Sequence, residues 1–293
     1  MKIRDMFLSG NFTLSFEIFP PKREGNLESL YRAIQDLMQF KPHFVSVTYG
    51  AGGTTREKTV EIASKIKNDF GQEVLAHLTC VQATRADISE ILEELIANNI
   101  ENILALRGDP PRDEEVFIKP QGGFGYANEL VDFIRTEGVF SIGVAGYPEC
   151  HIEAPSMAVD LDNLKRKVDA GAHFIITQIC FDNDYIYRFR DAAMERGISV
   201  PIIAGIFPIF NYKQIQKMTS LCGATIPSSL QDKLDRVSEK SEEVEKYGIE
   251  FAIHQSEDLL KNELSGLHFY SMNRSDHVTG ILNELSLPSS HGE

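Results

Sequence analysis

The stretch LSFEIFPP, residues 14–21, is a short apolar run typical of a buried β-strand, yet it carries a glutamate, Glu17. Seven runs of the same character follow, and between most of them lie a polar or glycine-rich turn and an amphipathic helix-like stretch. The seven are FVSVTYG (44–50), VLAHLTCV (74–81), NILALRGD (102–109), FSIGVAGYP (140–148), FIITQICF (174–181), PIIAGIFPI (201–209) and GLHFYSMNR (266–274). Eight strand-and-helix units predict an α/β fold, a single closed (β/α)₈ TIM barrel.

Nearly every predicted strand carries polar groups at or beside its C-terminal end, which is unusual for buried strands. These groups are Glu17, Thr48, His77, Arg107 with Asp109, Tyr147 with His151, Gln178, and Asn273 with Arg274. In parallel barrels the C-terminal rim is where the chemistry takes place. The same pattern therefore predicts the position of a functional site.

The length of 293 residues suits one barrel domain over 1–293, since no Pro-, Ser- or Gly-rich linker divides the chain. Helices are expected at about 26–40, 54–70, 84–98, 126–137, 155–171, 183–196, 211–221 and 239–264. Thr54 and Glu57 fit a capping box at the start of the second helix. Gly71, Gly171 and Gly197 are expected to end three of the helices. The charge run SEKSEEVEK is interpreted as a solvated helix face.

The composition, 42% hydrophobic and 25% charged residues, is that of a soluble globular protein with a large core. A formal net charge of −14 disfavours nucleic acids and anionic membranes as partners, because both need a basic face. The sequence shows no apolar run of membrane-spanning length and no signal peptide, so a cytoplasmic location is expected. A phosphate-bearing ligand must then meet a local cluster of positive groups.

No metal site is expected from residue spacing. Cysteines 80, 150, 180 and 222 form no CxxC or similar motif and are interpreted as reduced core residues. His77 and His151 have no carboxylate at a recognisable ligand spacing. A hydrogen bond to a cofactor and core packing are the two interpretations of these histidines.

Glu17 is the strongest candidate for acid–base chemistry. Phenylalanines flank it in sequence, and desolvation there is expected to raise the pKa of its carboxyl group so that it can donate a proton near neutral pH. The alternative is a structural glutamate paired with an arginine of the barrel. At the end of strand four, Arg107 and Asp109 flank Gly108, where a sharp turn allows close approach to a ligand. A salt bridge between Arg107 and Asp109 is the alternative there.

Two further segments are suited to a cofactor. TYGAGGTT presents Thr48, Tyr49 and a glycine-rich turn before a helix, although it is neither a Rossmann nor a P-loop fingerprint. After strand five, Tyr147 and His151 precede a helix that carries four polar candidates, Asp160, Asn163, Arg166 and Lys167. Residues 160, 163 and 167 share one helix face, so they can reach one ligand. A solvated face with intrahelical ion pairs is the alternative.

Gln178 and Arg274 are candidates for reading a substrate. A neutral amide in a buried strand needs hydrogen-bond partners, which a pterin edge or the core can supply. Arg274 can clamp a carboxylate in a two-pronged contact or close the barrel through an ion pair. The loop PPRDEEVFIKPQGGFGYANEL, residues 110–130, is a lid, a cofactor-contacting loop or a mobile surface loop.

The chain resembles the bacterial methylenetetrahydrofolate reductase family from about residue 12 to 287. The resemblance rests on segments in family order: SFEIFPPK, FVSVTYGAGG, AHLTC, LALRGDPP, YPECH, DLDNLKRKVDAGA, ITQICFD, AGIFPI and FYSMNR. It implies an FAD-dependent barrel that reduces 5,10-methylenetetrahydrofolate to 5-methyltetrahydrofolate in one-carbon metabolism. NADH or NADPH is the usual electron source in this family, and some members receive electrons through a partner protein.

The resemblance also implies roles for individual residues. Glu17 takes the position of the proton donor, and Asp109 that of the group that holds the pterin and stabilises a cationic intermediate. The flavin-contacting positions are Thr48, Tyr49, Ala51, His77, Arg107, Gly108, Asp109, Tyr126, Ala127, Tyr147, His151, Asp160, Asn163, Arg166 and Lys167. The folate-contacting positions are Glu17, Asp109, Gln178, Gln214 and Arg274.

One departure from the family concerns the nicotinamide. Related enzymes place an aromatic residue on the helix at 211–221, where this chain has Met218, and Phe207 is the candidate replacement. Two other functions fit a pterin-binding barrel: a methyltransferase without flavin, and a non-catalytic folate- or flavin-binding subunit of an electron-transfer complex. The family also implies a homo-oligomer or a complex subunit.

Overall fold

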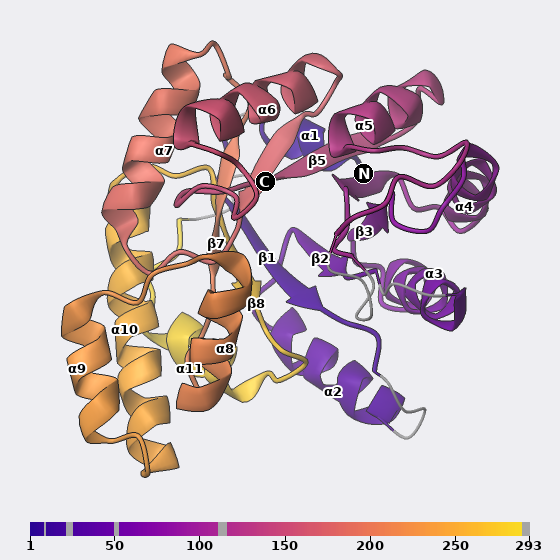
Figure 1. The fold of residues 1–293 in the computed structure, drawn as a ribbon. Helices are drawn as coiled ribbons and strands as arrows, with labels where there is room; N and C mark the ends of the chain where they lie inside the picture. Colours follow the sequence, from indigo (N-terminus) through magenta and orange to yellow (C-terminus); the bar gives the residue numbers. More distant parts are fainter. Residues whose placement is uncertain (9, 22–25, 50–52, 111–115, 289–293) are drawn as a thin grey trace.

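Eight parallel strands form a closed barrel in chain order, and helices surround it (Figure 1). The computed structural model describes residues 1–8, 10–21, 26–49, 53–110 and 116–288, without the side chains of 53–57. The strands are β1 (Thr13–Ile18), β2 (Phe44–Val47), β3 (Val74–Thr79), β4 (Asn102–Leu106), β5 (Ser141–Gly146), β6 (Phe174–Thr177), β7 (Ile202–Ile206) and β8 (Gly266–Tyr270). The predicted barrel is confirmed, and each strand lies within or next to its predicted run.

The described residues also form eleven helices. These are α1 (Ile3–Met6), α2 (Leu27–Met38), α3 (Gly53–Asn68), α4 (Arg85–Ala97), α5 (Ala127–Thr136), α6 (Met157–Asp169), α7 (Asn183–Glu195), α8 (Tyr212–Cys222), α9 (Ser228–Arg236), α10 (Ser241–Lys261) and α11 (Asp276–Glu284). The sequence pattern predicted eight of them and missed α1, α9 and α11. The long helix predicted at 239–264 is α10, which lies between β7 and β8.

The helix boundaries follow local chemistry. In α2, residues 30, 33, 34 and 37 are buried at the spacing of one helix face. Thr84 caps α4 through a capping box with Asp87. Gly71, Gly171 and Gly197 have φ values of +67°, +124° and +70°, as expected of glycines that end helices. The capping box predicted at Thr54 and Glu57 lies outside the described side chains.

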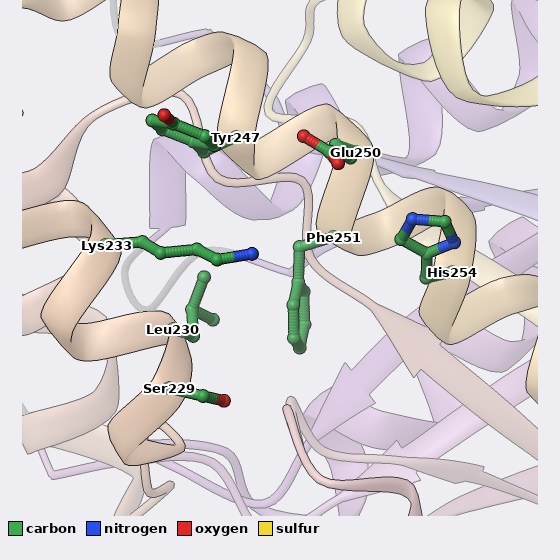
Figure 2. A pocket seen from close by; sticks show the side chains of 7 residues that line it. All are labelled: Ser229, Leu230, Lys233, Tyr247, Glu250, Phe251 and His254. Carbon is green, nitrogen blue, oxygen red and sulfur yellow. The ribbon is translucent and has the colours of Figure 1, made fainter.

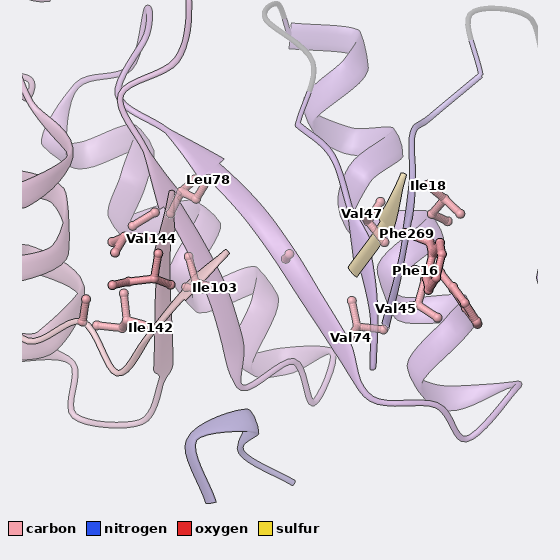
Figure 3. Close-up of a cluster of buried hydrophobic side chains, with 14 of the residues drawn as sticks. Phe16, Ile18, Val45, Val47, Val74, Leu78, Ile103, Ile142, Val144 and Phe269 are labelled. Atoms are coloured by element: carbon pink, nitrogen blue, oxygen red, sulfur yellow. The ribbon is translucent and has the colours of Figure 1, made fainter. Parts of the chain in front are cut away.

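Side chains of β1 alternate between two environments. Leu14, Phe16 and Ile18 belong to the main core between the strands and the helices, and Figure 3 shows Phe16 and Ile18 in it. Ser15 and Glu17 lie on the opposite face of the strand, in the barrel interior, where both approach His268 of β8. The interior is therefore polar beside β1.

Helix α1 covers the N-terminal end of the barrel. Ile3 is fully buried in an apolar cluster with Phe44, Leu75 and Phe174 from the barrel strands. The Ile3 amide donates to the Asn102 side chain over 2.7 Å. This apolar plug leaves the C-terminal rim as the end at which polar groups gather.

The charge run SEKSEEVEK is only partly a helix. Residues 238–240 precede α10, and the helical part is exposed except around Val244, which is buried. Within the described residues, no helix is long and apolar enough to cross a membrane. A small pocket of about 70 Å³ lies between α9 and α10, where Lys233 and Phe251 face each other (Figure 2). This pocket is formed by the outer helices and not by the strand ends.

Gly248 of α10 provides a test of the packing. A Cβ atom there would lie 1.8 Å from the carbonyl oxygen of Ile209, a backbone atom that cannot rotate away. We expect Gly248→Ala to lower the free energy of unfolding by about 1–3 kcal/mol, because overpacking forces the backbone to shift. In α11, a Cβ at Gly280 meets nothing closer than 3.8 Å.

Gly280→Ala is therefore the matched control, and its better helix propensity is expected to raise the free energy of unfolding by about 0.5–1 kcal/mol. Urea denaturation of both variants measures the difference. Equal effects at the two positions would contradict the packing described for α10.

Candidate functional site

Glu17 lies in a polar cluster built from four strands. Its Oε2 is 3.5 Å from His77 Nε2 on β3, 3.5 Å from Ser46 Oγ on β2 and 3.7 Å from His268 Nε2 on β8. His268 is fully buried, and its Nδ1 is 2.7 Å from Ser15 Oγ. The glutamate thus faces two imidazoles and a hydroxyl, and not the barrel arginine that was the alternative prediction.

The prediction of a raised pKa for Glu17 is wrong for the protein without ligands. Burial acts to raise the pKa of this carboxyl group, but the His268 ring, the charge of His77 and the Ser46 hydroxyl together lower it below its ordinary value. The sequence showed the apolar neighbours of Glu17 but not the two imidazoles that β3 and β8 bring to it.

The same environment lowers the pKa of His77 as well, which favours the neutral form of the ring where Glu17 favours its charged form. Only 7% of the side chain is exposed, and burial lowers the pKa of the ring to about 4, although the Glu17 carboxylate acts to raise it. The ring Nε2 is also 3.3 Å from Ser46 Oγ. His77 is therefore neutral at pH 7 and available as a hydrogen-bond partner.

The turn after β4 requires a glycine. Gly108 has φ +86°, and a Cβ there would lie 2.9 Å from Val81 Cγ1 and 3.0 Å from Thr79 Cβ. Asp109 follows it and is exposed. Thr79 Oγ1 is buried without a hydrogen-bond partner among the described residues. The turn thus presents a carboxylate at the rim beside an unsatisfied hydroxyl.

Arg107 pairs with Glu153, and not with Asp109. Its two Nη atoms are 2.5 and 2.6 Å from the Glu153 carboxylate oxygens, and its guanidinium lies 5.0 Å from the centre of the Phe117 ring. The contact with Glu153 raises the pKa of Arg107, and Glu153 itself is 51% exposed. The salt bridge joins the β4 turn to the loop after β5.

The loop after β5 and helix α6 form a second polar group. The Tyr147 and His151 rings meet edge to face at 4.6 Å, and the His151 amide donates to Asp160 Oδ2 over 2.9 Å. Lys167 Nζ donates to the Ala145 carbonyl over 2.6 Å and lies 5.7 Å from the centre of the Tyr147 ring.

Burial lowers the pKa of Lys167 to about 8, against the opposing charge of Asp160. Asn163 accepts a hydrogen bond from Arg166 on the exposed side of the helix. Arg166 is therefore solvated, as the alternative has it, but its partner within the helix is a neutral amide and not an ion pair. Lys167 is not part of a solvated face, because it points to β5.

The predicted substrate residues are spread over three strand ends. Gln178 follows β6, and its Oε1 accepts from the Ile179 amide. Gln214 lies in the first turn of α8. Its backbone N–H donates to the Asn211 side chain, which caps this helix. Arg274 holds Asp276 through Nε at 3.2 Å and Nη2 at 2.6 Å, an exposed local pair that does not close the barrel.

The remaining predicted cofactor residues lie near the starts of α3 and α5. Thr48 and Tyr49 follow β2 and are half-buried, and Ala51 lies outside the described residues. Tyr126 precedes α5 and is 65% exposed, and Ala127 is the first residue of that helix. The structure brings residues of β1, β2, β3 and β8 together around Glu17, whereas α6 forms a second group with the residues that follow β4 and β5.

The aromatic residues near β7 differ from the prediction for a stacking partner. Phe207 is 3% exposed, and its ring lies 6.2 Å from Phe210 and 6.4 Å from Tyr270. Met218 is half-buried against the same apolar cluster. In the described structure the Phe207 ring is therefore covered.

Four residues of the site, His268, Ser46, Thr79 and Glu153, were not predicted from the sequence. His268 and Ser46 occupy the interior positions of their strands, so the period-2 alternation of polar residues in β1, β2 and β8 was the available signal. Glu153 had no local signal, because its partner is 46 residues away.

A family model described as methylenetetrahydrofolate reductase matches residues 2–286. The chain belongs to the methylenetetrahydrofolate reductase family. It is 40% identical to methylenetetrahydrofolate reductase (NADH) 1 of Arabidopsis thaliana over 98% of this chain and 50% of that protein. It is 38% identical to 5,10-methylenetetrahydrofolate reductase of Escherichia coli over 96% of this chain and 93% of that protein. The chain thus spans about half the length of the plant methylenetetrahydrofolate reductases and most of the bacterial one.

Solved structures agree on the fold. A Clostridium thermocellum protein described as binding two copies of 5-methyl-5,6,7,8-tetrahydrofolic acid has a TM-score of 0.63 at 14% identity, covering 96% of both chains. An aldo/keto reductase from Klebsiella pneumoniae has a TM-score of 0.56 at 12% identity, covering 94% of this chain and 86% of that one. At these identities the likeness supports the barrel alone.

The lowered pKa of His77 predicts a pH-dependent stability. The unfolded chain takes up a proton at this residue near pH 6.5 and the folded protein only near pH 4. Lowering the pH from 6.5 to about 4 therefore lowers the free energy of unfolding, because the unfolded state binds more protons in this range. We expect His77 to remove on the order of 3 kcal/mol of stability as the pH falls from about 6.5 to about 4. Urea denaturation of His77→Asn across this range should show a shallower dependence.

His43, His151 and His173 also have pKa values lowered by burial, so the slope in His77→Asn is reduced and not abolished. His254 is 71% exposed, and His254→Asn is the control that should keep the original slope. A His77→Asn curve parallel to that of the unsubstituted protein would contradict the burial of a neutral His77.

Proposed function

We propose that the chain is an FAD-dependent enzyme that reduces 5,10-methylenetetrahydrofolate to 5-methyltetrahydrofolate, with Glu17 as the proton donor. The match of residues 2–286 to the family model carries this proposal. The structure supports it with one observation, the placement of Glu17 between His77 and His268 in the barrel interior. A carboxyl group in that position exchanges protons with few competing waters.

The residues around α6 and the β4 turn fit FAD. In a chain of net charge −14, two cationic side chains, Arg107 and Lys167, lie close enough to His151 to act on its pKa, and Arg166 lies on the exposed side of α6. Lys167 is held in a buried place where its charge is costly, so an added anionic or polyhydroxyl partner would improve its environment. The family positions that would hold FAD are Thr48, Tyr49, Ala51, His77, Arg107, Gly108, Asp109, Tyr126, Ala127, Tyr147, His151, Asp160, Asn163, Arg166 and Lys167. FAD supplies hydride transfer when bound.

Glu17 has a defined task in this proposal. Its Oε2 carries the proton that passes to N10 of the folate, which opens the five-membered ring to a cationic iminium. The lowered pKa leaves this carboxyl group ionised in the ligand-free protein, so the proton arrives when ligands cover the site. Added burial raises a carboxyl pKa, and burial is already the largest influence on Glu17.

The other substrate residues position the folate. Asp109 is exposed at the rim, where its charge would stabilise the cation and hold the pterin edge. Gln178 would read the pterin, and Arg274 would contact the carboxylate-bearing tail, with Gln214 on α8 completing the set. The Arg274 contact requires that its pair with Asp276 loosens or is shared.

NAD(P)H is the proposed electron source, and the names of the plant relatives favour NADH. Met218, at the position of the expected aromatic partner, provides a surface for the nicotinamide without a stacking ring. Delivery of electrons by a partner protein is the other route. Oxidation of NADH and NADPH by the purified FAD-loaded protein separates these possibilities directly.

Glu17→Gln tests the proton donor. We expect the variant to keep its yellow colour and its oxidation of NADH with an artificial acceptor, because both precede proton donation to the folate. Reduction of methylenetetrahydrofolate should fall by about 10²–10⁴-fold, the usual contribution of general acid catalysis. Normal folate turnover by Glu17→Gln would sink the assignment. Glu263→Gln, an exposed position next to α10, is the control.

Lys167→Met tests the cofactor site against Lys165→Met on the same helix. Lys167 points to β5, whereas Lys165 pairs with Asp169 along the helix. Loss of a charge-assisted contact should weaken FAD binding by about tenfold or more in Lys167→Met and leave Lys165→Met within about twofold. Fluorescence titration of the apoprotein with FAD gives both affinities. Equal affinities of the two variants for FAD would contradict the placement of Lys167 in the cofactor site.

A further inference from the structure

A group of three potential metal ligands lies where α10 meets α11. Glu245 comes from α10, and Asp276 and His277 are the first two residues of α11. Each offers one ligand atom, and these atoms lie within 4.8 Å of one another. Among the described residues this is the one group of three such side chains, and it belongs to neither the Glu17 cluster nor the α6 group.

His277 is the fixed member of the group. Its side chain is 2% exposed, and neither ring nitrogen has a hydrogen-bond partner. Glu245 Oε1 is 2.8 Å from Nε2 and Asp276 Oδ1 is 3.0 Å from Nδ1, but neither carboxylate is aligned for a hydrogen bond. A buried imidazole without an aligned hydrogen-bond partner requires an explanation, because buried polar groups are normally bonded. An ion can coordinate one of the two nitrogens, and the other nitrogen then keeps the carboxylate oxygen nearest to it.

The carboxylates are the adjustable members. The Glu245 and Asp276 side chains are 39% and 54% exposed, so they can rotate towards an ion and leave room for coordinating water. Asp276 also holds Arg274 with both oxygens, and the contact through Oδ2, at 2.6 Å, is the closer one. A cation bound at Oδ1 therefore leaves Oδ2 to Arg274.

We propose that Glu245, Asp276 and His277 bind a divalent transition-metal ion, with Zn²⁺ as the best-fitting probe. One imidazole and two carboxylates make a mixed nitrogen and oxygen ligand set that suits Zn²⁺. Mg²⁺ and Ca²⁺ prefer oxygen ligands alone. The ion ties the start of α11 to α10, next to Arg274 at the rim. The argument for this site does not rest on the proposed reductase activity, although Asp276 is also the partner of Arg274.

The test is calorimetric titration of the chelator-treated, FAD-loaded protein with Zn²⁺. The expected result is saturable binding of one equivalent and a higher melting temperature, because an ion that binds only the folded protein stabilises it. Glu245→Gln removes one ligand from a half-exposed position and should weaken binding by about tenfold or more. His277→Ala should do the same, and Glu245→Gln suffices if the loss of the buried ring prevents folding.

His254→Ala is the matched control. This histidine lies on α10 like Glu245 but is 71% exposed at the pocket between α9 and α10 (Figure 2), so its loss should leave the affinity unchanged. Three outcomes would overturn the proposal: no saturable binding, an affinity unchanged in Glu245→Gln, or Mg²⁺ binding as tightly as Zn²⁺. Without saturable binding, the Glu245 and Asp276 carboxylates are the only partners of the His277 ring among these three side chains.

Discussion

Thr13 to Glu17 of β1 pair in parallel with Gly266 to Tyr270 of β8, and this pairing closes the barrel. It sets Ser15 opposite His268, and so brings His268 to Glu17 from more than 250 positions along the chain. The approach requires a glycine at 266, where a Cβ would lie 2.1 Å from Thr13 Oγ1. Because the two strands are in this register, the polar face of β1 meets the polar face of β8 inside the barrel. A slip of one residue would turn Glu17 towards the apolar helices.

The sequence predicted the features that depend on local patterns. Eight apolar runs with polar C-terminal ends predicted the barrel and its rim, and Gly108 was recognised as the turn that presents Asp109. The helices that were missed have weak local signals. In α11, Gly280 and three β-branched residues lower the helix propensity, and burial of Val278 and Ile281 holds the helix in place. Tertiary packing therefore decides this element.

The sequence did not predict the electrostatics, because those depend on partners distant in the chain. The apolar neighbours of Glu17 indicated a raised pKa, whereas the imidazoles of His77 and His268 reverse the direction. Arg107 had a plausible local partner in Asp109, yet its guanidinium reaches Glu153 across the rim. In both cases the group that makes the contact is distant in the sequence, so the direction of the pKa shift of Glu17 and the identity of the partner of Arg107 required the three-dimensional structure.

The net charge of −14 says little about the rim, because Arg107, Lys167 and Arg274, among the residues that the structure describes, already have partners. The partner of Arg107 is Glu153, which is 51% exposed, so its carboxylate returns to water at small cost when a phosphate-bearing ligand replaces it. Lys167 differs, because its amine is bound to the Ala145 carbonyl and faces Asp160 in a place where charge is costly. A ligand anion there adds to the existing contacts instead of displacing one. The proposed cofactor would therefore replace Glu153 as the partner of Arg107, whereas at Lys167 it would add a contact without displacing a protein group. Of these two cations, Lys167 on α6 is the one at which no protein carboxylate has to be displaced.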